Sequence, residues 1–377
     1  MSDRPIAIEL FSGCGGTSTG LLDAGFDVRL GVDFDAPSIV AFRHNHEYRG
    51  SKGVVGDVSV LNGNELLEIA GVDRVDLLVG GPPCQPFSVA GKRQGLNDPR
   101  GFLVQEFLRL VKESDPRAVL IENVPALATS HDGYVLRTIE STLSELGYTT
   151  RSAILNGAHY GVPQNRRRLI IVGIKGVDPF DFPPMPTHGD DTLLTQPIIT
   201  SRMAIGDLPN VDQPESHDVP NHEPTNHTDQ MLKRFATLVP GKREKGSFHD
   251  RLHPDRPSYT LRAGSGNFSP LRPVHYEHDR VITVRESARI QGFSDDFIWP
   301  DSLSRLQQYR QVGNAVPPPL ARAVGEHIAK IVGWNLDPIA SAGDVSTRPN
   351  GLTMTAAERQ ARRERFHRGG ASYGKVS

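Results

Sequence analysis

One stretch decides the fold: Val75-Asp76-Leu77-Leu78-Val79, followed directly by Gly80-Gly81-Pro82-Pro83-Cys84. The apolar run predicts a buried strand, and the two glycines and two prolines end it sharply and stiffen the backbone before the sulfur. In open α/β sheets, ligands bind outside the carboxyl ends of the strands, which is where this thiol falls. Cys84 is therefore the candidate nucleophile. Its polar, cationic surroundings favour a thiolate over a core cysteine.

Length and composition narrow the possible folds, compartments and partners only broadly. The chain has 377 residues, of which 37% are hydrophobic, so it can bury a sizeable core and form two domains or one domain with a large insertion. Two cysteines and no charged-then-apolar leader predict a cytoplasmic protein without disulfides. No apolar run approaches the length of about 20 residues that a membrane span needs. Because the formal net charge is −2, a nucleic-acid surface would have to be a local basic patch.

A glycine-rich turn follows the first expected strand, residues 6–11. The turn reads Ser12-Gly13-Cys14-Gly15-Gly16-Thr17 and leads into an expected helix through Leu21 and Leu22. This arrangement can cradle a nucleotide, because glycines let a ligand approach the backbone and helix N-terminal N–H groups stay available. Ser18 stands where the dinucleotide fingerprint needs a third glycine, which disfavours NAD. A purely structural turn is the alternative.

Two acidic turns follow the next strands. The expected strand 28–32 ends at Asp33 and Phe34, and this carboxylate could accept from ribose hydroxyls while the ring stacks on a base. Asp35, before Ala36-Pro37, is expected to cap a helix. Asp57 could accept from an adenine amino group, although a loop cap is the simpler interpretation.

A carboxylate ends the next buried strand. After an expected helix over Phe102 to Val111, the run 118–121 predicts a strand that ends at Glu122. If this strand neighbours the one before Cys84, Glu122 lies beside the sulfur and could donate a proton or a hydrogen bond to a substrate nitrogen. The alternative is a salt bridge to a nearby arginine.

Charged residues also precede the strand that begins near Leu169. Alternation on entering that strand puts Gln164, Arg166 and Arg168 on one side. Because charges on a buried strand need partners, we expect this face to meet carboxylates, phosphates or a base carbonyl. An ordinary basic edge is the alternative.

Six motifs in this order resemble those of the DNA cytosine-5-methyltransferase family, and the likeness extends to about Val332. The departures are small, since Glu9 stands where the family often has Asp and Phe34 where some members have Trp. The matching motifs are Phe11-Ser12-Gly13-Cys14-Gly15-Gly16, Gly81-Pro82-Pro83-Cys84-Gln85, Glu122-Asn123-Val124, Gln164-x-Arg166-x-Arg168, Arg285-Glu286-Ser287-Ala288-Arg289-Ile290-Gln291-Gly292-Phe293 and Gln311-Val312-Gly313-Asn314-Ala315-Val316-Pro317.

The resemblance implies an α/β fold: a Rossmann-like S-adenosylmethionine-dependent methyltransferase domain, with a mostly parallel, doubly wound sheet, and an inserted, smaller target-recognition domain. Residues 1–179 and 281–334 would form the discontinuous catalytic domain and 180–280 the target-recognition region. Residues 335–377 would be a polar, basic, flexible tail. The histidines between 180 and 280 lack metal-binding spacing, so no zinc site is expected. The densest basic cluster there is Lys233, Arg234, Lys242, Arg243 and Lys245.

The resemblance also implies S-adenosylmethionine as the cofactor and no metal. The cofactor-binding residues that it implies are Phe11, Gly13, Cys14, Gly15, Gly16, Asp33, Phe34, Asp57, Val58, Asn314, Ala315 and Val316.

The implied chemistry follows from cytosine itself. Its C5 atom is too weakly nucleophilic to take a methyl group, so the Cys84 thiolate would first add at C6. Glu122 would hold or protonate N3, while Arg166 and Arg168 fix the pocket. The target base would be flipped out of the duplex. The candidates for phosphate contacts are Ser88, Lys92 and Arg100.

We therefore expect a DNA cytosine-5 methyltransferase that protects a site in a restriction-modification system. Its partners would be double-stranded DNA and a cognate restriction endonuclease, and its place the nucleoid in the cytoplasm. Two alternatives stay open: a tRNA cytosine-5 methyltransferase on the same scaffold, and a DNA-binding regulator that no longer turns over. A cytosine deaminase is excluded, because no second cysteine lies two residues after Cys84 and no His-x-Glu zinc signature is present.

Overall fold

The computed structural model describes residues 4–83, 102–191, 193–242, 249–263 and 273–336. Several residues singled out in the sequence lie outside these ranges. They are Cys84, Ser88, Lys92 and Arg100 of the predicted site, Arg243 and Lys245 of the basic cluster, and the tail from 337 onward.

The centre of the molecule is a seven-stranded sheet with the strand order β3-β2-β1-β4-β5-β8-β6. The chain begins in the middle of this sheet and winds outward to both sides, with β1 to β5 paired in parallel. Strand β8 is antiparallel to both of its neighbours. This confirms the predicted mostly parallel, doubly wound sheet. The strands are β1 (Ile6–Leu10), β2 (Asp27–Asp33), β3 (Lys52–Val55), β4 (Leu77–Gly80), β5 (Ala118–Asn123), β6 (Tyr148–Asn156) and β8 (Arg167–Lys175).

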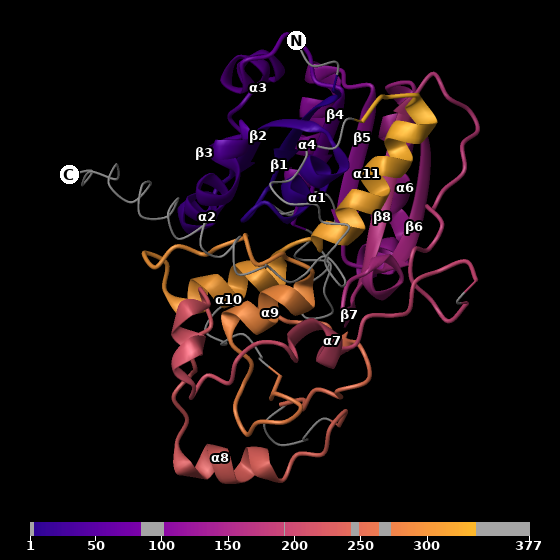
Figure 1. The fold of residues 1–377 in the computed structure, drawn as a ribbon. Helices are drawn as coiled ribbons and strands as arrows, with labels where there is room; N and C mark the ends of the chain where they lie inside the picture. Colours follow the sequence, from indigo (N-terminus) through magenta and orange to yellow (C-terminus); the bar gives the residue numbers. More distant parts are fainter. Residues whose placement is uncertain (1–3, 84–101, 192, 243–248, 264–272, 337–377) are drawn as a thin grey trace, which may run out of the picture.

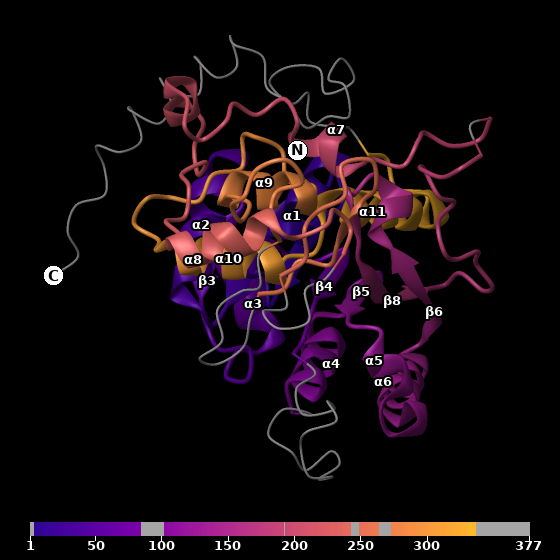
Figure 2. The ribbon, with the colours of Figure 1, turned by 90° about the horizontal axis from the view of Figure 1, so that it is seen from below.

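Helices cover both faces of the sheet (Figure 2). One face carries α3 (Gly63–Ala70), α4 (Phe102–Ser114) and α6 (Tyr134–Glu145), and the other carries α1 (Gly16–Ala24), α2 (Ala36–His46) and α11 (Pro318–Val332). In α4 the buried positions Val104, Phe107, Leu108 and Val111 follow helical spacing, so one stripe of the helix faces the strands.

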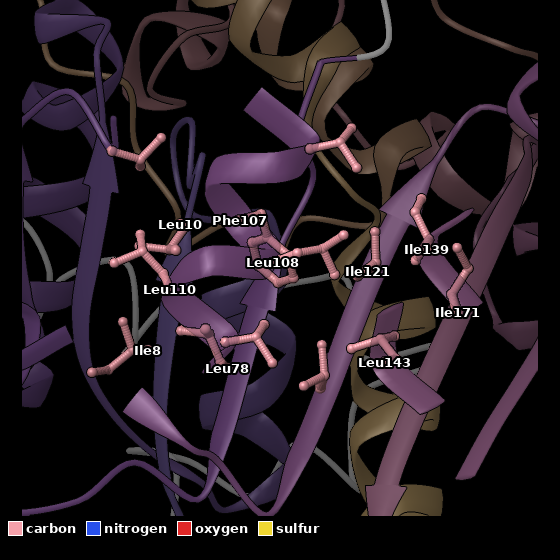
Figure 3. Packing of buried hydrophobic residues seen from close by; sticks show 14 of the residues in the cluster. Ile8, Leu10, Leu78, Phe107, Leu108, Leu110, Ile121, Ile139, Leu143 and Ile171 are labelled. Carbon is pink, nitrogen blue, oxygen red and sulfur yellow. The ribbon is translucent and has the colours of Figure 1, made fainter. Parts of the chain in front are cut away.

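The main core lies between the sheet and α4 with α6 (Figure 3). Side chains such as Ile8, Leu78 and Ile121 point from the strands toward Phe107 and Leu143. Burying each large apolar side chain contributes roughly 1.5–3 kcal/mol, which holds the strands firmly against the helices. The positions of the strand ends are set by this packing.

Gly80, at the end of β4, shows why the strand before Cys84 must end in glycine. A Cβ atom at this position would lie 2.5 Å from a ring carbon of Phe107 in α4. Any larger residue would push the strand end away from the helix. Gly80, the residue before the Gly81-Pro82-Pro83-Cys84 motif, is therefore required by packing.

A smaller lobe lies below the sheet in Figure 1. Its apolar core joins Ile199, Leu261 and Tyr276, from the inserted region, to Ile290 and Trp299 from the segment that follows it. The inserted region thus shares its core with residues beyond position 280. The lobe contains β7 (Gln164–Asn165), β9 (Ser258–Tyr259), α7 (Ser201–Ile205), α8 (Asp229–Ala236), α9 (Val284–Gln291) and α10 (Arg305–Asn314).

Candidate active site

Strands β4 and β5 bring Glu122 and the described segment before Cys84, residues 81–83, to one edge of the sheet. They pair in parallel, with Gly80 opposite Ile121, so the backbone that leads to Cys84 leaves the sheet beside Glu122. A Cβ atom on Gly81 would lie 3.3 Å from the Glu122 Oε2 atom. The sequence analysis expected Glu122 beside Cys84 only if the strands before them are neighbours. Strands β4 and β5 are neighbours in the sheet.

The amide of Asn123 fixes the segment just before Cys84. Its Nδ2 donates to the Pro82 carbonyl over 2.9 Å, and its Oδ1 accepts from the Val124 N–H over 2.9 Å. The Asn of the Glu122-Asn123-Val124 motif therefore ties the end of β5 to the two prolines. This contact holds the approach to Cys84 in place next to Glu122.

Glu122 forms an ion pair with Arg168. The Arg168 Nε and Glu122 Oε1 atoms are 2.7 Å apart, and the side chains are only 13% and 17% exposed, respectively. The pair forms because β8 runs antiparallel to β5, which places the first residues of β8 at the carboxyl end of β5. A carboxylate held in this way is oriented for a hydrogen bond to a substrate nitrogen. The salt bridge foreseen for Glu122 is thus present.

Arg166 is buried, and among the described residues its partners are two backbone carbonyls and not the carboxylate that the sequence offered as one possibility. Its Nη1 and Nη2 atoms donate to the backbone carbonyls of Leu261, over 3.2 Å, and Gly313, over 2.8 Å. Burial lowers the pKa of Arg166 to about 9, and the neighbouring Arg168 adds to the effect. The reason is that Arg166 lies between β7 and β8, where the lobe and the end of α10 meet the sheet. It links three separate parts of the chain.

The predicted cofactor loop is tied to the end of β2 by Asp33. Its Oδ2 accepts from the Gly13 N–H over 2.7 Å, and its Oδ1 accepts from the Asp35 N–H over 2.8 Å. Burial raises the pKa of Asp33. Beside it, the ring of Phe34 is 79% exposed. Asp35 caps α2 by accepting from the Ser38 N–H, as predicted.

The glycines of this loop serve different purposes. Gly13 has φ +54° and open space where a side chain would stand, which fits the expected approach of a ligand. A Cβ atom on Gly15 would lie 2.4 Å from the His46 ring, and one on Gly16 would lie 2.3 Å from the Val316 carbonyl oxygen. Gly15 and Gly16 therefore also have a packing reason to be glycine, and the contact of their backbone with the cofactor stays a prediction.

Cys14 and Val58 point away from solvent, although both belong to the predicted cofactor set. The Cys14 thiol is 2% exposed and lies 3.8 Å from the Gln311 carbonyl oxygen, to which it donates. Burial raises the pKa of this thiol, so it is a poor nucleophile. Val58 is 4% exposed and packs in the main core. Only the backbone of either residue could meet a ligand.

The remaining predicted cofactor residues are Asp57 and the segment from Asn314 to Val316. Asp57 accepts from the Ser59 N–H over 2.9 Å and from its hydroxyl over 2.7 Å, and these bonds lower the pKa of Asp57. Asp57 thus caps its own loop, and its contact with an adenine amino group stays a prediction. Asn314 is exposed at the end of α10, and Ala315 with Val316 lead the chain back to Gly16.

These groups fit S-adenosylmethionine by their chemistry. An exposed aromatic ring can stack on adenine, and the carboxylates of Asp33 and Asp57 can accept from hydroxyl and amino groups. They lie on the loops that leave β1, β2 and β3, at the carboxyl edge that also holds Glu122. No group of three or more potential metal ligands occurs among the described residues. No helix within those ranges is long and apolar enough to cross a membrane.

Glu9 is a buried carboxyl group that the sequence marked only as a departure from the family. Its Oε2 atom accepts from the Ser18 N–H over 2.9 Å and from the Ser18 hydroxyl, at the start of α1. Burial raises the pKa of Glu9 from 4.5 to about 7, and Asp33 adds to the rise. Glu9 thus replaces a side-chain cap, since Gly15 at the N-cap has none.

Glu9→Gln is expected to gain stability relative to the unchanged protein as the pH rises from 5 to 8. The folded chain keeps this proton up to about pH 7 and the unfolded chain loses it near pH 4.5, so the unchanged protein loses stability across that window. The difference between the two pKa values corresponds to a change of about 3 kcal/mol in the free energy of unfolding. Urea unfolding of both proteins at pH 5 and pH 8 measures the effect. A stability difference that does not vary with pH would contradict it.

Comparisons with known proteins agree with this geometry. The sequence profile of the family described as C-5 cytosine-specific DNA methylase matches residues 6–330. The Type II methyltransferase M1.HphI of Haemophilus parahaemolyticus is 35% identical over 342 residues, which cover 86% of this chain and 86% of the relative. The Type II methyltransferase M.XorII of Xanthomonas oryzae pv. oryzae is 35% identical over 375 residues, covering 87% and 85%.

Solved structures show the same architecture. A protein assigned as a DNA modification methyltransferase, encoded within an Escherichia coli prophage, superposes with a TM-score of 0.72 at 27% identity, covering 88% of this chain and 100% of that one. The S. pombe Dnmt2 methyltransferase shares the fold, with a TM-score of 0.60 at 21% identity over 88% of this chain and 99% of that one. The chain therefore belongs to the C-5 cytosine-specific DNA methylase family, whose members transfer a methyl group from S-adenosylmethionine to C5 of cytosine in DNA.

Proposed function

We propose that this enzyme is the protective methylase of a restriction-modification system and modifies one cytosine within a specific double-stranded DNA sequence. The observation that carries the catalytic part is the meeting of the Cys84 approach, Glu122 and Arg168 at one sheet edge. The naming of its relatives as Type II methyltransferases supports the biological role. A cognate endonuclease would be a functional partner, and the enzyme would work on the nucleoid in the cytoplasm.

The proposed mechanism begins with the protein's own groups. The Cys84 thiolate adds to C6 of a flipped-out cytosine, which makes C5 nucleophilic. Glu122 holds N3 and supplies the proton that neutralises the ring, and Arg168 keeps this carboxyl group oriented. When bound, S-adenosylmethionine supplies an electrophilic methyl group. C5 would take this methyl group, with S-adenosylhomocysteine as the leaving group. A water or another base then removes the C5 proton, N3 returns its proton to Glu122, and the Cys84 thiolate leaves, which restores the aromatic ring.

Arg166 supports this site indirectly, through contacts with the backbone of two other segments. Its two carbonyl contacts join the segment before β8 to Leu261, in the inserted region, and to Gly313, at the end of α10. Arg166 lies two residues before Arg168, and Gly313 directly precedes Asn314. We assign Arg166 the role of holding the lobe against the catalytic edge, and the contact with cytosine to its neighbour Arg168.

The inserted region is the proposed source of sequence specificity. The described residues between 180 and 280 add no strand to the seven-stranded sheet, and they include the basic residues Lys233, Arg234 and Lys242. Exchanging the region for that of another family member is expected to change the methylated sequence. Because its core is shared with α9 and α10, the graft should extend to residue 312. An unchanged methylated sequence in a folded graft would contradict the assignment.

The proposed function is tested with the purified protein and labelled S-adenosylmethionine, in separate reactions with unmethylated genomic DNA and with transfer RNA, and the DNA is then sequenced at base resolution. The expected result is 5-methylcytosine at a single short sequence. Label in transfer RNA instead would favour the RNA-modifying alternative. DNA binding without any transfer would favour a regulator that has lost turnover.

A further inference from the structure

Arg109, in the middle of α4, joins this helix to the loop that carries Asp57. Its Nη2 atom donates to the backbone carbonyls of Val58, over 3.1 Å, and Leu61, over 2.8 Å. Helix α4 is the helix that follows the Cys84 segment in the chain. One guanidinium therefore spans the space between α4 and the loop that leaves β3.

Two carboxylates hold the guanidinium in this position. Glu106 and Glu113 lie one turn away on either side of Arg109 in the helix, with N–O distances of 2.7 and 2.9 Å. Glu113 also accepts from the Gly63 N–H over 2.8 Å. A Cβ atom on Gly63 would lie 2.6 Å from the Glu113 Cβ, so the loop sits directly against α4. The loop is thus held at three main-chain points.

The contacts of Asp57 alone do not place it relative to the sheet. Its carboxylate binds only Ser59, two residues along the same loop, among the hydrogen bonds of the described residues. The loop is anchored by the Val58 side chain in the core and by Arg109 from the helix. Without Arg109, the bond from the Gly63 N–H to Glu113 would be the remaining side-chain hydrogen bond from α4 to this loop among the described residues.

We propose that Arg109 is a positioning residue for cofactor binding: it holds the 58–61 loop so that Asp57 can accept a hydrogen bond from the adenine amino group. This inference rests on the proposed contact between Asp57 and adenine. The side chain must be arginine, because a lysine ammonium cannot reach two carbonyls and two carboxylates with fixed geometry. Because Arg109 and Glu113 are 30% and 34% exposed, their contribution to overall stability is small.

The test compares the affinities of two compounds by calorimetry without DNA. The first is S-adenosylhomocysteine, and the second is the same molecule with hydrogen in place of the exocyclic amino group of adenine. The unchanged protein is expected to prefer the first by roughly tenfold, the worth of one hydrogen bond to a carboxylate. In Arg109→Met this preference falls to less than twofold, while the affinity for the second compound stays nearly constant.

Two further variants keep the test decisive. Arg109→Lys retains the positive charge and is expected to lose part of the preference, so it serves if Arg109→Met does not fold. Arg74→Met is the matched control, because Arg74 also pairs with a carboxylate, that of Asp76, but its own side chain is 73% exposed and lies outside the Asp57 loop. The control is expected to keep the full preference.

Asp57→Ala separates the two possible failures. If Asp57→Ala abolishes the preference for the amino group and both Arg109 variants retain it, the role of Arg109 is overturned and the Asp57 contact stands. If Asp57→Ala leaves the preference unchanged, the Asp57 contact is overturned and the role of Arg109 with it. Loss of the preference in both sets of variants supports the proposal.

Discussion

Cys84→Ser is expected to lower methyl transfer to DNA by at least about 1000-fold, while the affinity for S-adenosylmethionine changes by less than about twofold. A serine hydroxyl is almost entirely protonated at neutral pH, so it cannot replace a thiolate as the group that adds to C6. The two side chains differ by one atom, so the fold and the cofactor loops are unaffected. Single-turnover transfer and calorimetric cofactor binding measure the two quantities.

A covalent trap makes the Cys84 prediction sharper. DNA that carries 5-fluorocytosine at the target position cannot lose a proton from C5, so the bond from Cys84 to C6 is not released after transfer. The unchanged enzyme is expected to form a complex with this DNA that survives denaturation. Cys84→Ser is expected to form none. Appreciable turnover or a stable adduct in Cys84→Ser would remove Cys84 as the nucleophile.

Glu122→Gln is expected to lower kcat by about 100-fold to 10,000-fold, with a much smaller effect on DNA affinity. The amide keeps the size of the side chain but cannot give a proton to N3. It also leaves the guanidinium of Arg168, which is only 13% exposed, without its carboxylate partner. Transfer rates at saturating DNA, together with equilibrium DNA binding, separate the two effects.

Glu326→Gln is the matched control for Glu122→Gln. Glu326 forms an ion pair with Arg322 of the same length, 2.7 Å, but both side chains are nearly half exposed on α11. The same chemical change is expected to leave kcat within about twofold there, since exposed ion pairs contribute little. If Glu122→Gln also stays within tenfold of the unchanged enzyme, the proton-donating role of Glu122 is wrong.

The sequence predicted the sheet well because its signals are local. Apolar runs of four to seven residues that end in glycine or acidic turns mark β1, β2, β4 and β5, and the structure has a strand at each. The cap of α2 by Asp35 follows equally from its neighbours. The position of Glu122 beside the Cys84 approach also followed, once the two strands proved to be neighbours.

The sequence could not predict contacts between distant segments. The partners of Arg166 lie 95 and 147 residues away, and no local pattern points to a backbone carbonyl. Gly15 and Gly16 are likewise crowded by residues distant in the sequence, His46 and Val316, so no local pattern shows why they must be glycine. Arg109 had a readable signal, with Glu106 and Glu113 at helical spacing, but its two carbonyl partners lie 51 and 48 residues earlier.

The packing of α11 on α1 has a consequence for biosynthesis. Leu320, Val324 and Ile328 cover Leu21 and Phe26, and a Cβ atom on Gly325 would lie 2.7 Å from the Leu21 side chain. A ribosome releases α1 near the beginning of the chain and α11 only after the whole inserted region. The apolar face of α1 that packs on α11 therefore stays exposed to solvent during most of translation. The docking of α11 on α1 is thus a late step that joins distant parts of the chain. Until it occurs, the exposed apolar surface favours aggregation and chaperone binding.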